Sequence, residues 1–146
     1  PVCAAGFVLP LVNIYSSMRI SDDLSSHVST FYAELVRIRM VVEAVKRGEK
    51  VLFLLDELFR GTNSQDRHDG AVAVLKTLSN SNTIGIVSTH DLELCNLAEN
   101  NPERFVNFHF EEFYRNNTIE FDYTLKKGRS TTKNAMFLIR MIGIDI

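Results

Sequence analysis

Cysteine is scarce in this sequence, and neither sign of charge is in strong excess. Only Cys3 and Cys95 occur among 146 residues, and they form no Cys-x-x-Cys pair. This rules out a small disulfide-stapled scaffold, gives no support to a zinc knuckle or a redox motif, and is typical of reduced thiols in a cytoplasmic protein. The 16 basic and 18 acidic residues leave a net charge of −2, which indicates no dominant surface for nucleic acid.

Long apolar runs, repeats and linkers are also missing. No apolar run approaches the ~18 residues needed to span a membrane, so we expect no membrane association. No repeat, low-complexity stretch or linker divides the chain, so we expect one compact unit. With 45% hydrophobic and 23% charged residues, the composition is that of a globular protein with a core. The chain has no initiator Met and opens within an apolar segment, so we expect it to be cut from a longer protein.

Three apolar segments predict strands. Residues 7–16 are apolar and β-prone around Pro10, which predicts one or two strands. Residues 51–55 and 83–87 are short continuous apolar runs, typical of strands that are buried on both faces of a parallel sheet. Because helical patterns alternate with these runs, the chain predicts an α/β fold with a mostly parallel sheet and flanking helices.

Helices are predicted between and after these strands. Apolar residues three and four positions apart predict a helix over residues 30–47. A polar, glycine-containing loop over residues 60–70 precedes a predicted helix over residues 70–79. A short helix over residues 92–98 is predicted to begin after Asp91, a good N-cap.

The last third of the chain predicts a hairpin. Residues 105–114 and 118–125 are separated by Asn116-Asn117, a turn signal, and the second run alternates apolar with polar residues. We therefore expect a C-terminal β-hairpin with one face in water, followed by a closing helix over residues 135–142.

Polar residues follow both of the buried runs. Asp56 and Glu57 come after the first, and Thr89 and His90 after the second. Ligands of open α/β sheets bind just beyond the carboxyl ends of the strands, so we expect these groups to lie near one another. An Asp in this position can hold Mg²⁺, usually through water. The Glu that follows it can polarise a water molecule for attack on a γ-phosphate. A His at the end of the neighbouring strand can donate a hydrogen bond to that phosphate. Taken singly, an acidic pair that ends a strand and a lone His are more often structural.

Two further features bear on phosphate binding. Ser29 and Thr30 stand at a predicted helix N-terminus, which favours phosphate, although, taken alone, they are more often an ordinary N-cap. A Walker A loop needs the pattern G-x-x-x-x-G-K-[ST], and the chain contains no Gly-Lys dipeptide. The segment Gly128-Arg129-Ser130 lacks the lysine and follows a predicted hairpin strand, so we reject it as a phosphate loop.

Taken in order, these strings resemble the C-terminal ATPase domain of MutS-family proteins, the DNA mismatch-repair and MutS-like group. The resemblance covers nearly the whole chain. It is carried by residues 1–4, Arg19-Ile20 with Asp22-Asp23-Leu24, Ser29-Thr30-Phe31 with Glu34, residues 54–57 with Arg60-Gly61-Thr62, Ser88-Thr89-His90, and Leu125-Lys126-Lys127-Gly128 with Ser130. It implies a P-loop NTPase fold of the ABC type that here lacks its first strand and its P-loop. Residues 1–146 are then a partial MutS-type ATPase domain, truncated after the Walker A motif.

The resemblance also implies a role for each candidate residue. Asp56 would help to hold Mg²⁺, Glu57 would orient the attacking water, and His90 would contact the γ-phosphate of ATP. Ser29 and Thr30 would reach the ATP of the partner subunit, in a homodimer formed through the ATPase domains. Other domains of the full protein would bind DNA. Without a P-loop, the chain alone is expected to be inactive.

Two departures from the family pattern narrow this assignment. Phe59 stands where the family has the first Gly of G-R-G-T, and the loop over residues 63–69 is longer than in mismatch-repair members. These differences favour a MutS-like subgroup over the mismatch-recognition enzyme itself. The alternative is a non-catalytic, P-loop-less dimerisation or scaffold domain, against which the retention of Asp56, Glu57 and His90 argues. In either case, loss of the P-loop strand is expected to leave an apolar sheet edge that invites pairing with another chain.

Overall fold

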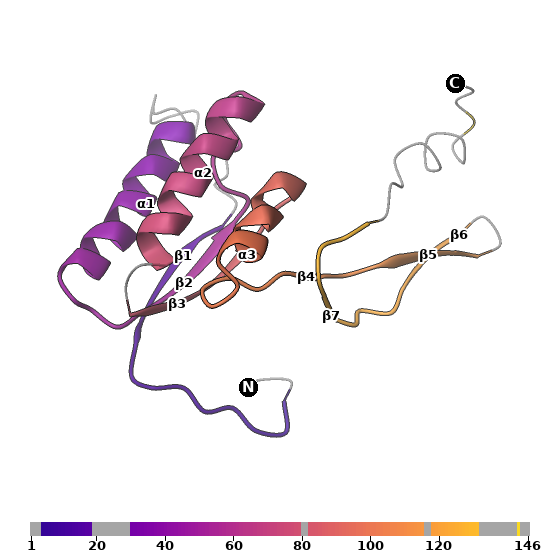
Figure 1. The fold of residues 1–146 in the computed structure, drawn as a ribbon, viewed down its shortest axis with the longest axis horizontal. Helices are drawn as coiled ribbons and strands as arrows, with labels where there is room; N and C mark the ends of the chain where they lie inside the picture. Colours follow the sequence, from indigo (N-terminus) through magenta and orange to yellow (C-terminus); the bar gives the residue numbers. More distant parts are fainter. Residues whose placement is uncertain (1–3, 19–29, 80–81, 116–117, 132–142, 144–146) are drawn as a thin grey trace. The chain divides into compact units, whose positions relative to one another are not determined.

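The computed structural model describes residues 4–18, 30–79, 82–115, 118–131 and 143 (Figure 1). It divides the chain into two compact units, Pro1–Leu94 and Cys95–Ile146, where the sequence analysis expected one. The physical reason is the strand pairing, because among the described residues the strands before Leu94 pair with one another, and so do those after Cys95. The two units are therefore described separately. No helix in the described part of the chain is both long and apolar enough to cross a membrane.

The first unit contains a parallel three-stranded sheet with β2 (Val51–Asp56) in the centre, between β1 (Asn13–Ser17) and β3 (Thr83–Ser88). Both continuous apolar runs are therefore strands, as predicted, but the expected burial on both faces is wrong for the described residues: β2 alternates buried with half-buried residues, and Ile84 and Ile86 of β3 are exposed because no described element covers that face. In the segment over residues 7–16 the strand begins only at Asn13, since Pro10 has no N–H to donate to a ladder. The parallel register brings the carboxyl ends of all three strands to the same edge of the sheet.

Two helices pack on this sheet. The first, α1 (Thr30–Lys46), contacts α2 (Ser64–Ser79) as well as β1 and β2. It ends just before Gly48, whose φ of +79° and whose N–H bond to the Val45 carbonyl (2.9 Å) form the expected C-terminal stop. The core between helices and sheet consists of alternate residues of β2 and one face of each helix: Val51, Phe53, Leu55, Ile38, Val41, Ala44, Val45, Ala71, Leu75 and Leu78.

The start of α2 corrects the sequence prediction. Residues 64–69, assigned above to a loop, form the first turns of the helix. Asn63 is the N-cap, because its Oδ1 accepts a hydrogen bond from the Asp66 N–H (2.9 Å) while its side-chain amide donates to the Asp66 carboxylate (2.6 Å). This reciprocal cap satisfies free donors of the first turn, so a polar segment without an apolar stripe is helical.

Beyond β3 the predicted helix over residues 92–98 is present but irregular. It consists of a 3₁₀ turn, η1 (Leu92–Cys95), followed by α3 (Asn96–Asn100). Asp91 caps it as expected, because its Oδ1 accepts a hydrogen bond from the Glu93 N–H at 3.0 Å.

The second unit contains two small antiparallel pairs. β5 (Glu112–Arg115) pairs with β6 (Thr118–Phe121) and confirms the predicted hairpin, whereas β4 (Phe108–His109) pairs with β7 (Lys126–Lys127). The Asn116-Asn117 turn and the predicted closing helix over residues 135–142 lie outside the described residues. The apolar side chains of the alternating run are exposed rather than covered by the described residues: Phe121, Tyr123 and Leu125.

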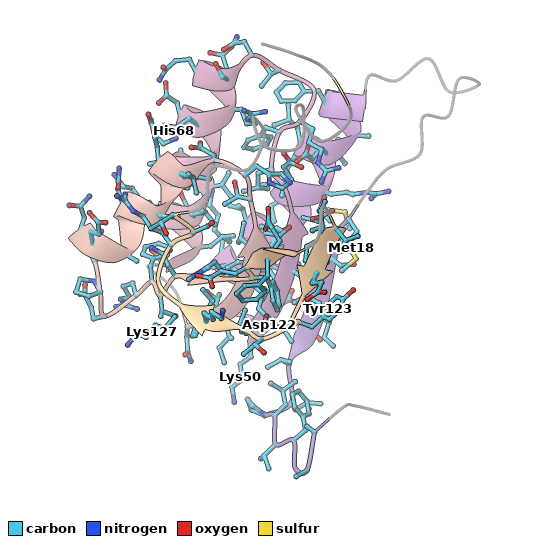
Figure 2. The ribbon with its side chains drawn as sticks, turned by 90° about the vertical axis from the view of Figure 1, so that its right-hand side faces the viewer. Met18, Lys50, His68, Asp122, Tyr123 and Lys127 are labelled. Carbon is cyan, nitrogen blue, oxygen red and sulfur yellow. The ribbon has the colours of Figure 1, made fainter. Side chains whose placement is uncertain are left out.

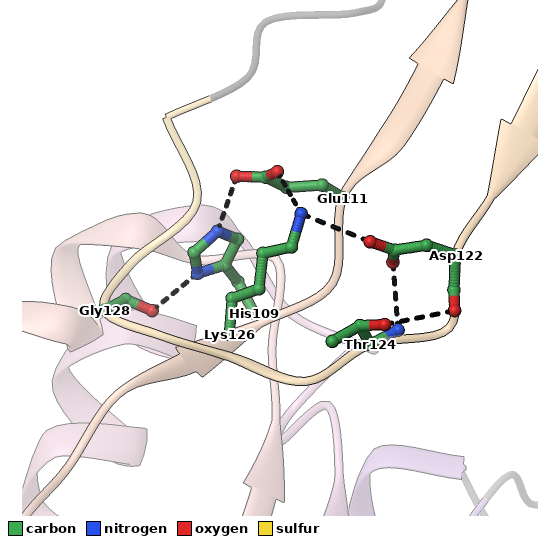
Figure 3. Close-up of polar contacts among 6 residues, drawn as sticks. All are labelled: His109, Glu111, Asp122, Thr124, Lys126 and Gly128. Carbon is green, nitrogen blue, oxygen red and sulfur yellow. Dashed lines mark hydrogen bonds and ion pairs between the residues drawn. The ribbon is translucent and has the colours of Figure 1, made fainter.

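A polar cluster joins the two pairs of strands in this unit (Figure 3). The Glu111 carboxylate accepts hydrogen bonds from Lys126 Nζ (2.6 Å) and from His109 Nε2 (3.0 Å). His109 Nδ1 lies 2.9 Å from the Gly128 carbonyl oxygen. Both partners of this ring are acceptors, so both bonds form only when His109 carries two ring protons. The Glu111 carboxylate, followed by the Gly128 carbonyl, accordingly raises the pKa of His109.

A close approach between strands leads to the first prediction. Gly85 is paired with Phe53, and a Cβ added at Gly85 would lie 1.9 Å from the Phe53 ring, which is itself buried in the core. We expect Gly85→Ala to destabilise the unit by about 1–3 kcal/mol, the usual cost of overpacking. Urea unfolding would measure it, with Gly6→Ala as the matched control, since nothing lies within 4 Å of the Cβ added there. Equal stability of the two variants would contradict this packing.

The outer edge of β3 leads to the second prediction. Among the described strands, β3 pairs only with β2, and its Ile84 and Ile86 side chains are 56% and 66% exposed. An uncovered apolar edge strand is a template for pairing. We expect the chain alone to associate as its concentration rises, as measured by light scattering, and a clean monomer across the concentration range would contradict this.

Candidate functional site

The candidate site lies at the carboxyl edge of the three-stranded sheet. Asp56 is the last residue of β2 and pairs with Ser88, the last residue of β3. The Ser88 hydroxyl donates a hydrogen bond of 2.5 Å to Asp56 Oδ1, and the Glu57 N–H donates to the Ser88 carbonyl at 3.0 Å. The end of β3 therefore holds both acidic residues in place, while their side chains remain 36% and 21% exposed. Both are orientated and accessible to a ligand.

A guanidinium group lies between the two carboxylates. Arg60 Nη2 is 2.6 Å from Glu57 Oε2 and 3.3 Å from Asp56 Oδ2. Two adjacent negative charges repel each other, and Arg60 offsets that repulsion. The two carboxylates therefore already have a positively charged partner, the Arg60 guanidinium. The spacing i, i+3 and i, i+4 is a signal that could have identified Arg60 from the sequence.

The carboxylates of Asp56 and Glu57 suit magnesium, which keeps several water ligands, better than they suit a metal ion whose ligands all come from protein side chains. No group of three or more His, Cys, Asp or Glu side chains that could hold a metal occurs in the described ranges. Magnesium prefers hard oxygen ligands and keeps several waters, so one or two carboxylates and substrate phosphates suffice. Asp56 and Glu57, adjacent at the sheet edge, meet that requirement.

His90 lies two residues beyond the end of β3, on the same edge as the acidic pair. The turn that carries it is held by the Asp91 N–H, which donates to Thr89 Oγ1 at 3.0 Å. The His90 side chain is exposed, and within the described part of the chain no hydrogen bond or ion pair joins it to Glu57. The structure thus brings the backbone of His90 to the predicted edge without bringing the two side chains into contact.

A second histidine, which the sequence analysis missed, holds this turn. His68 projects from α2 (Figure 2), and its Nδ1–H donates to Asp91 Oδ2 at 2.7 Å. Both side chains are largely buried, and the hydrogen bond to Asp91 is the main reason that the pKa of His68 is raised above its ordinary value. The pair ties α2 to the residue next to His90.

The loop after Asp56 has an unusual backbone. Glu57 and Phe59 have φ values of +52° and +61°, a left-handed region that glycine favours. Glu34 of α1 reaches this loop, and its Oε1 accepts a hydrogen bond of 2.6 Å from the Phe59 N–H. Burial raises the pKa of Glu34, against the opposing effects of that hydrogen bond and of the nearby Arg60.

Of the two residues predicted to contact phosphate, Ser29 and Thr30, the structure describes only Thr30. Ser29 lies outside the described residues. Thr30 is the first residue of α1, so the predicted helix N-terminus is at the expected place. Their contact with a nucleotide stays a prediction.

Comparisons with known proteins agree on one family. The chain matches the family described as "MutS domain V" over residues 2–145. It is also similar to the human protein named "MutS protein homolog 4", with 32% identity over 127 residues, which cover 83% of this chain and 13% of that protein. The chain thus spans about an eighth of the length of this curated relative.

The contact between His68 and Asp91 leads to the third prediction. A pKa that is raised in the folded state adds stability below the unfolded value, which is 6.5 for histidine, and this stability is lost as the pH rises through the raised folded value. We therefore expect the difference in unfolding free energy between the wild type and His68→Gln to be largest below about pH 6.5 and to shrink above it. Urea unfolding at several pH values would measure this difference.

The control for this pH dependence is a second histidine. His109→Gln should leave the contribution of His68 intact, because His109 bonds to Glu111 and Gly128 rather than to Asp91. A difference between wild type and His68→Gln that did not change with pH would refute the ion pair.

Proposed function

The chain belongs to the MutS family, whose domain V it matches over nearly all of its length, and on this premise we propose that it is the ATP-binding and hydrolysing module of a MutS-like DNA mismatch repair protein. The observation that carries the proposal is the acidic pair Asp56-Glu57. It ends the central strand of a parallel sheet and is held there by Ser88 and Arg60. The fold that we propose is that of a P-loop NTPase of the ABC type, for which the parallel β2–β3 pair with polar residues at its carboxyl edge is the supporting feature.

Each residue at the edge has a chemical task in this proposal. Asp56 would hold Mg²⁺ through water, with its carboxylate in the orientation that the Ser88 hydroxyl gives it. Bound Mg²⁺ would neutralise charge on the phosphates. Glu57 orients a water molecule and accepts its proton, and its 21% exposure leaves room for that water. His90, exposed beyond β3, donates a hydrogen bond to the γ-phosphate.

The remaining contacts to the nucleotide are proposed to come from a partner subunit and from a phosphate-binding loop of the full protein. Thr30, the first residue of α1, and Ser29, which precedes it in the sequence, are proposed to contact the ATP bound by the partner subunit of a homodimer, through the free N–H groups of a helix N-terminus. The phosphate-binding loop is not among these 146 residues. Gly128 is no substitute, since it follows β7, a two-residue antiparallel strand. We also propose that other domains of the full protein bind DNA and that the full protein is cytoplasmic.

The fourth prediction tests Glu57. In the full-length protein that carries this domain, Glu57→Gln should lower the rate of ATP hydrolysis at least ~100-fold, because the amide cannot accept the proton of the attacking water. ATP affinity should change little, since Gln keeps the size and polarity of the side chain. Steady-state hydrolysis and calorimetric titration with Mg-ATP would measure the two quantities.

The same experiment separates the two functions considered for this chain. Glu120→Gln, at an exposed position of β6, is the matched control and should hydrolyse ATP like the wild type. The 146-residue chain alone should bind Mg-ATP weakly or not at all, whereas the full-length protein should bind it. If the full-length protein also fails to bind, the domain is a non-catalytic dimerisation or scaffold module.

A further inference from the structure

The loop that follows β2 holds two of its residues in an unfavourable backbone conformation. Glu57 and Phe59 both have positive φ, although neither is glycine. Such residues keep a left-handed backbone only where the surrounding structure enforces it, and they concentrate at functional sites. At position 59 the family pattern has a glycine, for which this backbone is unstrained. The chain therefore needs contacts that hold Phe59 where glycine would need none.

Those contacts come mainly from the first turns of α1. Glu34 accepts a hydrogen bond from the Phe59 N–H at 2.6 Å. The Phe31 ring meets the Phe59 ring edge to face, with centroids 6.0 Å apart and planes at 69°. Phe59 is consequently only 4% exposed. We call Phe31, Glu34 and Phe59 the loop clamp.

Two glycines make room for the clamp. A Cβ added at Gly70 of α2 would lie 3.0 Å from the Phe59 ring. A Cβ added at Gly61 would lie 3.0 Å from Cβ of Phe31. Both aromatic side chains thus fill spaces that only glycine leaves open, so the clamp is closely fitted rather than incidental.

The clamp connects Glu57, proposed to act on the ATP of its own chain, with the start of α1, proposed to reach the ATP of the partner subunit. Glu34 lies about one turn along α1 from Thr30, and Phe59 lies two residues after Glu57 and next to Arg60. A shift of the first turn of α1 would therefore alter the backbone that carries Glu57. We propose that Glu34 is a positioning residue, which holds Glu57 in its working orientation and makes that orientation depend on the position of α1. This inference rests on the proposed function.

The test compares two replacements of Glu34 in the full-length protein. Glu34→Gln keeps an oxygen that accepts the Phe59 N–H, whereas Glu34→Ala does not. We expect Glu34→Ala to lower kcat about tenfold or more with the Kd for Mg-ATP changed less than about threefold, because misplacement of a reacting group costs rate rather than affinity. The single variant Glu34→Gln should keep kcat within about threefold of the wild type. Equal losses in the two variants would overturn the proposal.

A second pair of variants tests the role of the strained backbone. Phe59→Gly removes both ring and strain, and the matched Phe59→Ala removes the ring but keeps the strain. Adding Glu34→Ala should lower kcat by less than about twofold in the Phe59→Gly background and by about tenfold in the Phe59→Ala background. The same loss in both backgrounds would show that Glu34 does not act through this backbone.

A readout that needs no ATP distinguishes this inference from the proposed function. Hydrogen exchange of the Phe59 amide should accelerate about tenfold or more in Glu34→Ala and stay near the wild-type rate in Glu34→Gln. If the wild type fails to hydrolyse ATP but exchange responds in this way, the proposed function fails and the clamp stands. If hydrolysis is normal and exchange is the same in all variants, the clamp is refuted and the proposed function stands.

Discussion

The parallel pairing of β2 with β3 is the constraint on which the candidate site depends. Because the register places Asp56 opposite Ser88, both strands end at the same level and their following residues share one edge. Ladder hydrogen bonding continues for one step beyond Asp56, through the Glu57 N–H and the Ser88 carbonyl. A shift of register by one residue would turn Asp56 toward the opposite face and break the Ser88 contact. The chemistry at this edge thus depends on apolar residues several positions away.

Much of the first unit could be predicted because its strands are continuous apolar runs and α1 has a regular apolar stripe. The bounds of α1, β2 and β3 differ from the sequence prediction by a single residue at most. The start of α2 was wrong because its first turns are polar, and their helical state depends on a cap by Asn63 rather than on burial. The division into two units also escaped prediction, since it follows from which strands pair with one another rather than from a linker in the sequence.

For the site, sequence reasoning found the residues that end strands but did not predict the contacts that hold them. The sequence alone shows that polar residues follow the two apolar runs: Asp56, Glu57 and His90. Their supports are pairs far apart along the chain: Ser88 with Asp56, Glu34 with Phe59, and His68 with Asp91 are separated by 32, 25 and 23 residues. No local pattern predicts such contacts, because each depends on how helices pack on the sheet. The family glycine replaced by Phe59 was noticed, but its left-handed backbone became apparent only in three dimensions.

The described part of the second unit has few buried apolar side chains. Of its described residues, Leu97 alone is a buried hydrophobic, and its two-stranded pairs are joined by the charges of His109, Glu111 and Lys126. Isolated two-stranded pairs are at best marginally stable in water, and these ion pairs are only partly buried, so salt screens them in part. Among its described residues, strand pairing in this unit is therefore held by polar contacts more than by a core, so these strands are expected to open before those of the three-stranded sheet when denaturant is added.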